Sequence, residues 1–234
     1  IIMMRKGLVI VLSGICLICI VLLLVPVNKK EIEIEQPRDV AVKKEKVEDV
    51  AVNVMEQYRI QYNNSDIVAL LDIPNTNINT VVPRGEDNEF YLNHLPDKQE
   101  NSLGSVFLDY RNELNDRKLI IYGHNSPNVD TLFKGLEQYL NSDYYSTHNN
   151  IYLQTDYTRY RYQIFSVYIA TSNVSHVNLN LTNKEYKRHL QWLKEESIYD
   201  TGVSIYDEDI LILQTCFYNP ENSYWIIAAK KVDD

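Results

Sequence analysis

The run Leu211-Ile212-Leu213-Gln214-Thr215-Cys216 is apolar over its first half and ends on a thiol. A second run, over residues 119–124, is built in the same way and ends on the imidazole of His124, about ninety residues upstream. Short apolar runs that are rich in β-branched residues and bounded by turn residues predict β-strands. A thiol and an imidazole held at the ends of two strands are the side chains that a cysteine transpeptidase or hydrolase requires.

The rest of the sequence favours a reactive role for Cys216. Outside an apolar N-terminal segment the chain has no second cysteine, so Cys216 is expected to be a free thiol. A thiol with the ordinary pKa of about 8.5 is mostly protonated at neutral pH, and therefore needs a base or a cation nearby to become a nucleophile. The alternative is that Cys216 is a small buried hydrophobic residue, as many free cysteines are.

Among the five histidines, His124 is the best candidate for that base. It follows an apolar strand and a glycine, and so is expected where a strand opens into a loop. The alternative for His124 is a structural histidine whose hydrogen bonds are satisfied. The other four histidines lie in polar surroundings and are predicted to be ordinary surface residues: His94, His148, His176 and His189.

Around these two runs the sequence predicts a mostly β (β+α) domain. The pattern of short β-branched or aromatic runs predicts eight strands, over residues 67–74, 78–82, 105–109, 118–122, 151–156, 159–171, 209–216 and 223–231. A capping-box pattern at 182–185 begins a helix over about 183–197, directly before the cysteine strand. An amphipathic stretch follows His124 at 132–140, and one or two helices are expected within 39–62. The expected architecture is a closed or nearly closed β-barrel with helices in its connections.

The composition of the chain bears on its binding partners and on how well its domain is packed. The net charge of −9 argues against nucleic acid as a partner. Eighteen tyrosines and only seven glycines indicate a well-packed, β-rich domain rather than a disordered one. No cluster of metal-ligating residues is visible, and no metal or other cofactor is expected.

The N-terminal region is predicted to be a membrane anchor. Residues 7–27 carry no charge, and roughly 20 apolar residues are enough for a helix to span a bilayer. The segment lacks the small-residue cleavage site of a signal peptide, so it is predicted to stay uncleaved. We expect residues 1–6 in the cytoplasm, a charged stalk with N-terminal helices over 28–65, and an extracellular catalytic domain over 66–234.

Several segments of the chain occur together, in this order and at this spacing, in one family. The segments are 71–78, 81–83, 87–88 with 91–92, 104–112, 121–125 and 213–216. Over about residues 66–234 the chain resembles the class B sortases, the membrane-anchored cysteine transpeptidases of Gram-positive cell surfaces. The predicted helix before the cysteine strand and the single N-terminal anchor also resemble this class.

The resemblance implies a fold, a reaction and its partners. The fold is an eight-stranded sortase barrel with N-terminal helices, and the catalytic pair is His124 and Cys216. The cysteine would cleave an NPxTN- or LPxTG-like sorting signal of a surface protein or pilin after its threonine, forming a thioester. An amine of a peptidoglycan precursor or of a protein lysine would then accept the acyl group. Thr215 would help to position the substrate, and Gln214 stands where this class commonly has serine.

One departure from the family pattern concerns the third catalytic residue. The family has an arginine on the strand after the cysteine, and an ungapped comparison places Tyr224 there; no arginine follows Arg188. A tyrosine donates one neutral hydrogen bond, which is weaker than a charge-assisted one. Lys230 is too far along the strand to replace the arginine. Two hypotheses follow: an active class B sortase, or a catalytically weakened sortase-like protein that binds sorting signals or scaffolds surface assembly.

Overall fold

The computed structural model describes residues 53–233, and the predicted anchor at 7–27 and most of the stalk lie outside this range. Among the described residues, none of the helices combines the length and the apolar character needed to cross a bilayer. The one helix of the predicted N-terminal group that falls within the range is α1, Val54–Tyr62.

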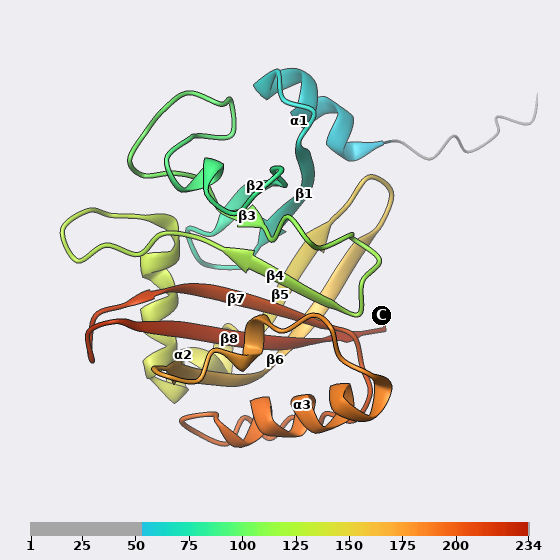
Figure 1. Ribbon diagram of the computed structural model, residues 1–234, viewed down its shortest axis with the longest axis vertical. Helices are drawn as coiled ribbons and strands as arrows, with labels where there is room; N and C mark the ends of the chain where they lie inside the picture. Colours follow the sequence, from blue (N-terminus) through green and yellow to red (C-terminus); the bar gives the residue numbers. More distant parts are fainter. Residues whose placement is uncertain (1–52, 234) are drawn as a thin grey trace, which may run out of the picture. The chain divides into compact units, whose positions relative to one another are not determined.

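The described residues form one eight-stranded sheet that is nearly closed into a barrel (Figure 1). Its strands are β1 Ile67–Asp72, β2 Asn79–Pro83, β3 Phe107–Leu108, β4 Lys118–Tyr122, β5 Asn150–Gln154, β6 Arg159–Ala170, β7 Ile210–Phe217 and β8 Ser223–Val232. The strand order is β2-β1-β5-β6-β8-β7-β4-β3, and the two end strands β2 and β3 lie close to each other. The predicted barrel is therefore confirmed, and each predicted strand is present, with small differences at the ends.

One strand pair differs from all the others in the sheet of the described residues. The pairing of β4 with β7 is parallel, whereas the remaining pairs are antiparallel. Parallel neighbours point their carboxyl ends to the same edge of a sheet. The residues that follow β4 and those that end β7 consequently meet at one rim of the barrel.

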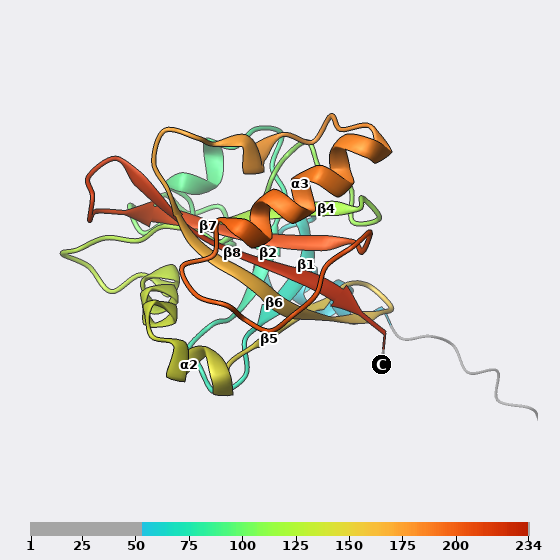
Figure 2. The same ribbon diagram turned by 90° about the horizontal axis from the view of Figure 1, so that it is seen from below.

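The apolar runs of β4 and β7 are continuous because both faces of these strands are buried. One face lies inside the barrel and includes Leu119, Ile121, Leu211 and Leu213. Alternate residues, such as Ile120 and Ile212, belong to a second core cluster on the opposite face. That second cluster is covered by α3, Asn183–Glu195, which lies along the outside of the sheet (Figure 2).

The helices occupy the connections, as predicted. Besides α1 and α3 they are η2 Phe90–Leu92, η3 Leu132–Leu140, α2 Ser142–Thr147 and η4 Ser175–Val177. The capping box of α3 is present, because Thr182 accepts a hydrogen bond from the backbone of Glu185 and Glu185 accepts one from the backbone of Thr182. The amphipathic stretch at 132–140 forms a 3-10 helix, η3, whose Phe133 and Leu136 are fully buried.

Candidate active site

The parallel pairing of β4 with β7 brings the two predicted catalytic residues to the same place. Tyr122 lies beside Gln214 in the pair, and the backbone N–H of Gly123 donates to the Gln214 carbonyl at 3.2 Å. One residue further, the Thr215 hydroxyl donates to the Gly123 carbonyl at 2.7 Å. His124 therefore leaves β4 next to the point where Cys216 ends its apolar run. Two segments about ninety residues apart in sequence supply a thiol and an imidazole to one rim.

The glycine before His124 is required by a close approach to η3. A Cβ atom at Gly123 would lie 2.6 Å from a ring carbon of Phe133, which is closer than real Cβ atoms come. The ring of Phe133 is fully buried and has little room to move. The absence of a Cβ at Gly123 thus lets the chain pass close to Phe133 directly before His124.

Asn125 holds the histidine segment against the cysteine segment. This residue is buried, and its side-chain amide donates to the carbonyl of Cys216 at 3.1 Å and to the carboxylate of Glu137. Its backbone carbonyl accepts a hydrogen bond from the Tyr218 hydroxyl at 2.9 Å. Three segments are therefore fixed to one another around the thiol, and sequence reasoning did not assign this role to Asn125.

Among the described residues, His124 and Cys216 are neighbours that form no hydrogen bond with each other. The Nε2 atom of His124 lies 2.5 Å from the carbonyl oxygen of Leu92 in η2. Because a carbonyl only accepts, Nε2 carries the proton and donates it to that oxygen. Burial raises the pKa of the Cys216 thiol. The thiol is therefore mostly protonated near neutral pH, and the Nε2 proton of His124 is engaged by Leu92.

Tyr224, the residue predicted to stand at the arginine position of the family, lies near the start of β8. It is the direct cross-strand partner of Cys216 in the β7–β8 pair, so both side chains lie on the same face of the sheet. Its ring packs partly buried against the second core cluster, and within the described residues its hydroxyl has no hydrogen-bond partner. A neutral phenol with a free hydroxyl therefore stands where the family resemblance implies a guanidinium.

The two lysines that follow Tyr224 do not supply the missing charge. Lys230 is paired with Ile210 at the other end of β7, and its ammonium lies 3.1 Å from the carboxylate of Glu208. The ammonium of Lys231 lies over the ring of Tyr160, 3.9 Å from its centre. Both cations are engaged away from Cys216, which agrees with the distance argument made from the sequence.

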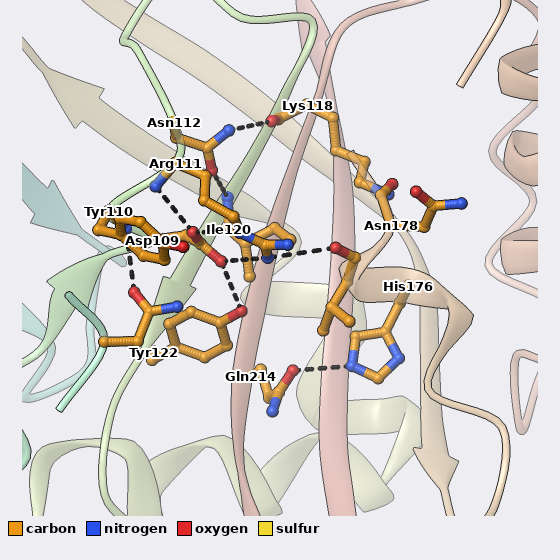
Figure 3. Close-up of polar contacts among 12 residues, drawn as sticks. Asp109, Tyr110, Arg111, Asn112, Lys118, Ile120, Tyr122, His176, Asn178 and Gln214 are labelled. Atoms are coloured by element: carbon orange, nitrogen blue, oxygen red, sulfur yellow. Dashed lines mark hydrogen bonds and ion pairs between the residues drawn. The ribbon is translucent and has the colours of Figure 1, made fainter. Parts of the chain in front are cut away.

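Gln214, two residues before Cys216, is tied to the connection between β6 and α3. Its side-chain oxygen lies 2.7 Å from Nε2 of His176 in η4, and Figure 3 shows the two side chains facing each other. Thr215 is buried, with its hydroxyl engaged by the Gly123 carbonyl. Both residues thus have structural partners, and their predicted substrate contacts remain predictions.

The prediction that His176 and His189 are ordinary surface residues is wrong. His176 is fully buried and His189 is 8% exposed, on the face of α3 that covers the sheet. Burial lowers the pKa of His176 to about 4 and that of His189 to about 3. The burial of both histidines was missed because their neighbours in the sequence are polar. For His189 a signal was present, since it falls at helical spacing between the buried residues Tyr186 and Leu193.

A second polar network lies on the same side of the sheet (Figure 3). The fully buried carboxylate of Asp109 accepts hydrogen bonds from the Arg111 guanidinium at 2.6 and 2.9 Å and from the Tyr122 hydroxyl at 2.8 Å. Burial alone would raise the pKa of Asp109, but these bonds hold it below its ordinary value. Arg111 also reaches the carbonyl of Val177 at 3.2 Å. This network is structural, because it fastens the β3–β4 region to η4.

Among residues 53–233 no cluster of His, Cys, Asp and Glu could hold a metal ion.

The fold and this site define a class of protein: a nearly closed β-barrel that presents a cysteine and a histidine at one rim, where two parallel strands end. The sequence profile of the sortase domain matches residues 71–232, and the chain belongs to the sortase family. The resemblance to class B sortases is confirmed by the relatives and solved structures to which the chain is similar.

Two curated relatives carry the name sortase B. The protein from Listeria monocytogenes is 32% identical over 161 residues, which is 67% of this chain and 65% of that protein. The protein from Staphylococcus aureus is 31% identical over 173 residues, or 71% of this chain and 70% of that protein. The match thus spans slightly less than two thirds of the Listeria protein.

The solved structures agree with the sequence relatives. Clostridium perfringens sortase B has a TM-score of 0.70 at 30% identity, covering 76% of this chain and 100% of that one. A substrate complex of Staphylococcus aureus sortase B has a TM-score of 0.71 at 28% identity, covering 79% and 87%. A complex of sortase B with triglycine has a TM-score of 0.70 at 28% identity, covering 78% and 88%.

Proposed function

We propose that this protein is a cysteine transpeptidase of the sortase B type. The observation that supports the proposal is the parallel β4–β7 pair, whose hydrogen bonds join the residue before His124 to the residues before Cys216 at one rim of the barrel. The sequence and structural similarity to sortase B proteins supports the same reaction class.

In the first half of the reaction the sulfur of Cys216 attacks the carbonyl carbon of the threonine in a sorting signal. The imidazole of His124 takes the thiol proton and then gives it to the departing amine, so the peptide C–N bond breaks as the C–S bond forms. The product is a thioester on Cys216. The Tyr224 hydroxyl, on the same face as the sulfur, is placed to donate to the oxyanion of the tetrahedral intermediate.

In the second half an acceptor amine attacks the thioester carbon and releases the thiol. The acceptor class we propose is an amine of a peptidoglycan precursor or of a protein lysine, and the donor class is a surface protein or pilin with an NPxTN- or LPxTG-like signal. The substrate complex and the triglycine complex of the related sortase B structures support a peptide donor and an amine acceptor.

A specific observation favours a second candidate function. The position opposite Cys216 holds a neutral tyrosine, and no cation of β8 compensates for it. Loss of one oxyanion donor typically lowers turnover by about 10²–10³-fold. A catalytically weakened sortase-like protein, which binds sorting signals or scaffolds surface assembly, is therefore the alternative.

We also propose that the catalytic domain is extracellular and held to the cell membrane by residues 7–27. The supports are the uncharged length of that segment and the chemistry of the barrel, which acts on cell-surface proteins in the proposed reaction. Membrane fractionation before and after a high-salt wash tests this, and release of the protein by salt would contradict an integral anchor.

Intact-mass spectrometry of the full-length protein in mild detergent tests the proposed reaction. The protein is mixed with a panel of NPxTN- and LPxTG-like peptides, and a thioester adduct is sought on the wild type and on Cys216→Ala. An adduct on the wild type alone is the expected result. Tight peptide binding without any adduct would instead support the weakened, binding-only alternative.

A further inference from the structure

The hydrogen bonding between β4 and β7 continues beyond the last residue of β4. The N–H of Gly123 donates to the carbonyl of Gln214 at 3.2 Å. The carbonyl of Gly123 accepts a hydrogen bond from the Thr215 hydroxyl at 2.7 Å. The backbone directly before His124 is therefore fixed to the two residues directly before Cys216.

Asn125 fixes the chain on the other side of His124. Its side-chain amide donates to the carbonyl of Cys216 at 3.1 Å, and its backbone carbonyl accepts a hydrogen bond from the Tyr218 hydroxyl at 2.9 Å. The nucleophile segment thus holds the residue after His124 through two hydrogen bonds, as it holds the residue before it. Each of the two bonds on this side depends on a side chain, so each can be removed by a substitution that leaves the backbone intact.

The orientation of the Asn125 amide is set by its partners. The carbonyl of Cys216 and the carboxylate of Glu137 only accept hydrogen bonds, so both face the amide N–H groups. Asn125 is 3% exposed, and its Oδ1 has no hydrogen-bond partner among the described residues. A buried acceptor without a partner lowers stability, so the arrangement favours the two N–H bonds over a satisfied oxygen. Glu137 consequently acts on the site through Asn125.

We propose that Asn125 and Tyr218 are positioning residues, which hold His124 within proton-transfer reach of the Cys216 sulfur. Transfer of the thiol proton to the imidazole requires the two heavy atoms to come within hydrogen-bond reach of each other. The ring turns about its side-chain bonds, whereas the four hydrogen bonds hold the backbone on both sides of it. A displacement of about 1 Å can slow a reaction about 10²-fold. This inference rests on the proposed catalytic pair and adds two residues that contact neither the substrate nor the reacting atoms.

Single-turnover mass spectrometry of the full-length protein tests the effect on thioester formation over a range of sorting-peptide concentrations. For Asn125→Ala we expect the maximal rate to fall about 10–100-fold at an unchanged half-saturating peptide concentration, because the amide contacts the backbone of the nucleophile. Tyr218→Phe removes one hydroxyl and should lower the maximal rate about fivefold. The matched controls are Asn128→Ala and Tyr206→Phe, at exposed residues, and both should behave as the wild type.

A double variant separates positioning from support of the fold. In Asn125→Asp/Glu137→Gln the charge of the pair is unchanged, and the amide introduced at position 137 can donate to the carboxylate at position 125. The bond to η3 is thereby restored, but no N–H remains for the Cys216 carbonyl. Denaturant unfolding should show a smaller loss of stability than in Asn125→Ala, while thioester formation stays slow. Recovery of the rate together with the stability would overturn the inference, because Asn125 would then serve only to anchor η3.

Alkylation of Cys216 by iodoacetamide tests the inference without a sorting peptide. The reagent reacts with the thiolate, so the rate at pH 6 relative to pH 9 reports how far His124 assists ionisation. Peptide mapping separates Cys216 from the two cysteines of the N-terminal segment. We expect Asn125→Ala to lower this ratio about tenfold and Asn128→Ala to leave it unchanged. If the wild type forms no thioester, the proposed function fails and this ratio still decides the inference; an equal ratio in Asn125→Ala and the wild type overturns it.

Discussion

Tyr224 and Cys216 face each other across the β7–β8 pair, and this single contact separates the two functional hypotheses. A guanidinium is permanently charged and donates in a fork, whereas a phenol donates one neutral bond. The phenol ring is partly buried, and its hydroxyl has no partner among the described residues, so the position is open to a change of side chain.

The variant Tyr224→Arg is expected to speed thioester formation by about 10²-fold, because it restores a charge-assisted donor beside the thiol. Single-turnover mass spectrometry of the acylated protein measures this rate. Tyr157→Arg, which adds the same charge at an exposed turn between β5 and β6, is the control and should have no effect. A slower Tyr224→Arg protein would mean that the phenol is the adapted donor of this enzyme.

Gly123 is the residue whose size limits the approach of His124 to η3. We expect Gly123→Ala to lower the free energy of unfolding by about 1–3 kcal/mol, since the added methyl group would overlap the Phe133 ring. Denaturant unfolding measures the change. The double variant Gly123→Ala/Phe133→Leu should recover part of the loss relative to the sum of the single variants, and strict additivity would contradict the proposed overlap.

At the scale of elements, α3 covers the outer face of β4, β7 and β8, and its beginning is set by the Thr182–Glu185 capping box. Thr182→Ala removes one half of that box and is expected to lower the free energy of unfolding by about 1 kcal/mol. Thr171→Ala, at an exposed residue before η4, is the matched control and should change little. Equal stability of the two variants in denaturant unfolding would show that α3 does not depend on its cap.

η4 is fastened beside β7 by two hydrogen bonds. The His176–Gln214 contact and the Arg111–Val177 hydrogen bond both fasten this short helix to the sheet beside the site. The segment between β6 and α3 is therefore held against the same strand that ends on Cys216.

At the scale of the whole molecule, three basic groups are buried between the sheet and α3. The ammonium of Lys118 lies 3.1 Å from Nε2 of His189 and donates to the carbonyl of Asn178. Burial, followed by the nearby charge of Arg111, lowers the pKa of Lys118 to about 7. His176 and His189 have pKa values of about 4 and 3. The two histidines are consequently held neutral by the fold near pH 7, whereas Lys118 gains or loses its proton at about that pH.

The stability of the protein should depend on pH in a direction set by these groups. Between about pH 3 and 6.5 the unfolded chain binds more protons at His176 and His189 than the folded chain does, so stability is lost as the pH falls below 6.5. Lys118 acts in the same direction between about pH 7 and 10.5. We expect the free energy of unfolding to rise from pH 5 to pH 7, with a slope of at most about 1.4 kcal/mol per pH unit for each group.

Chemical denaturation of His189→Gln at pH 5 and pH 7 tests this expectation, because removing one buried imidazole should flatten the dependence. His94→Gln, at a partly exposed histidine between η2 and β3, should keep the slope of the wild type. An unchanged slope in His189→Gln would show that His189 does not titrate as its burial implies.

Much of the architecture could be predicted from local sequence. The strand predicted at 118–122 is β4 with the same ends, and the capping box marks the start of α3. Tyr224, which an ungapped comparison sets at the arginine position of the family, lies opposite Cys216 in the β7–β8 pair, and its catalytic role stays a prediction. These features depend on side-chain periodicity and on hydrogen bonds between residues close in the chain, and both can be recognised in the sequence alone.

Other features arise only when distant segments pack together. The parallel β4–β7 pair, the Asn125 hydrogen bond to Cys216, the contact of His124 with Leu92 and the burial of His176 join residues that lie far apart in sequence. Local patterns carry no information on which strands become neighbours or on what covers a polar side chain. The sequence by itself therefore determined the strands, the helices and the two reactive side chains, His124 and Cys216. The tertiary structure decided how these two side chains are held. Their hydrogen-bonding and packing partners come from other parts of the fold, through the register of the sheet and the packing of η2, η3 and η4.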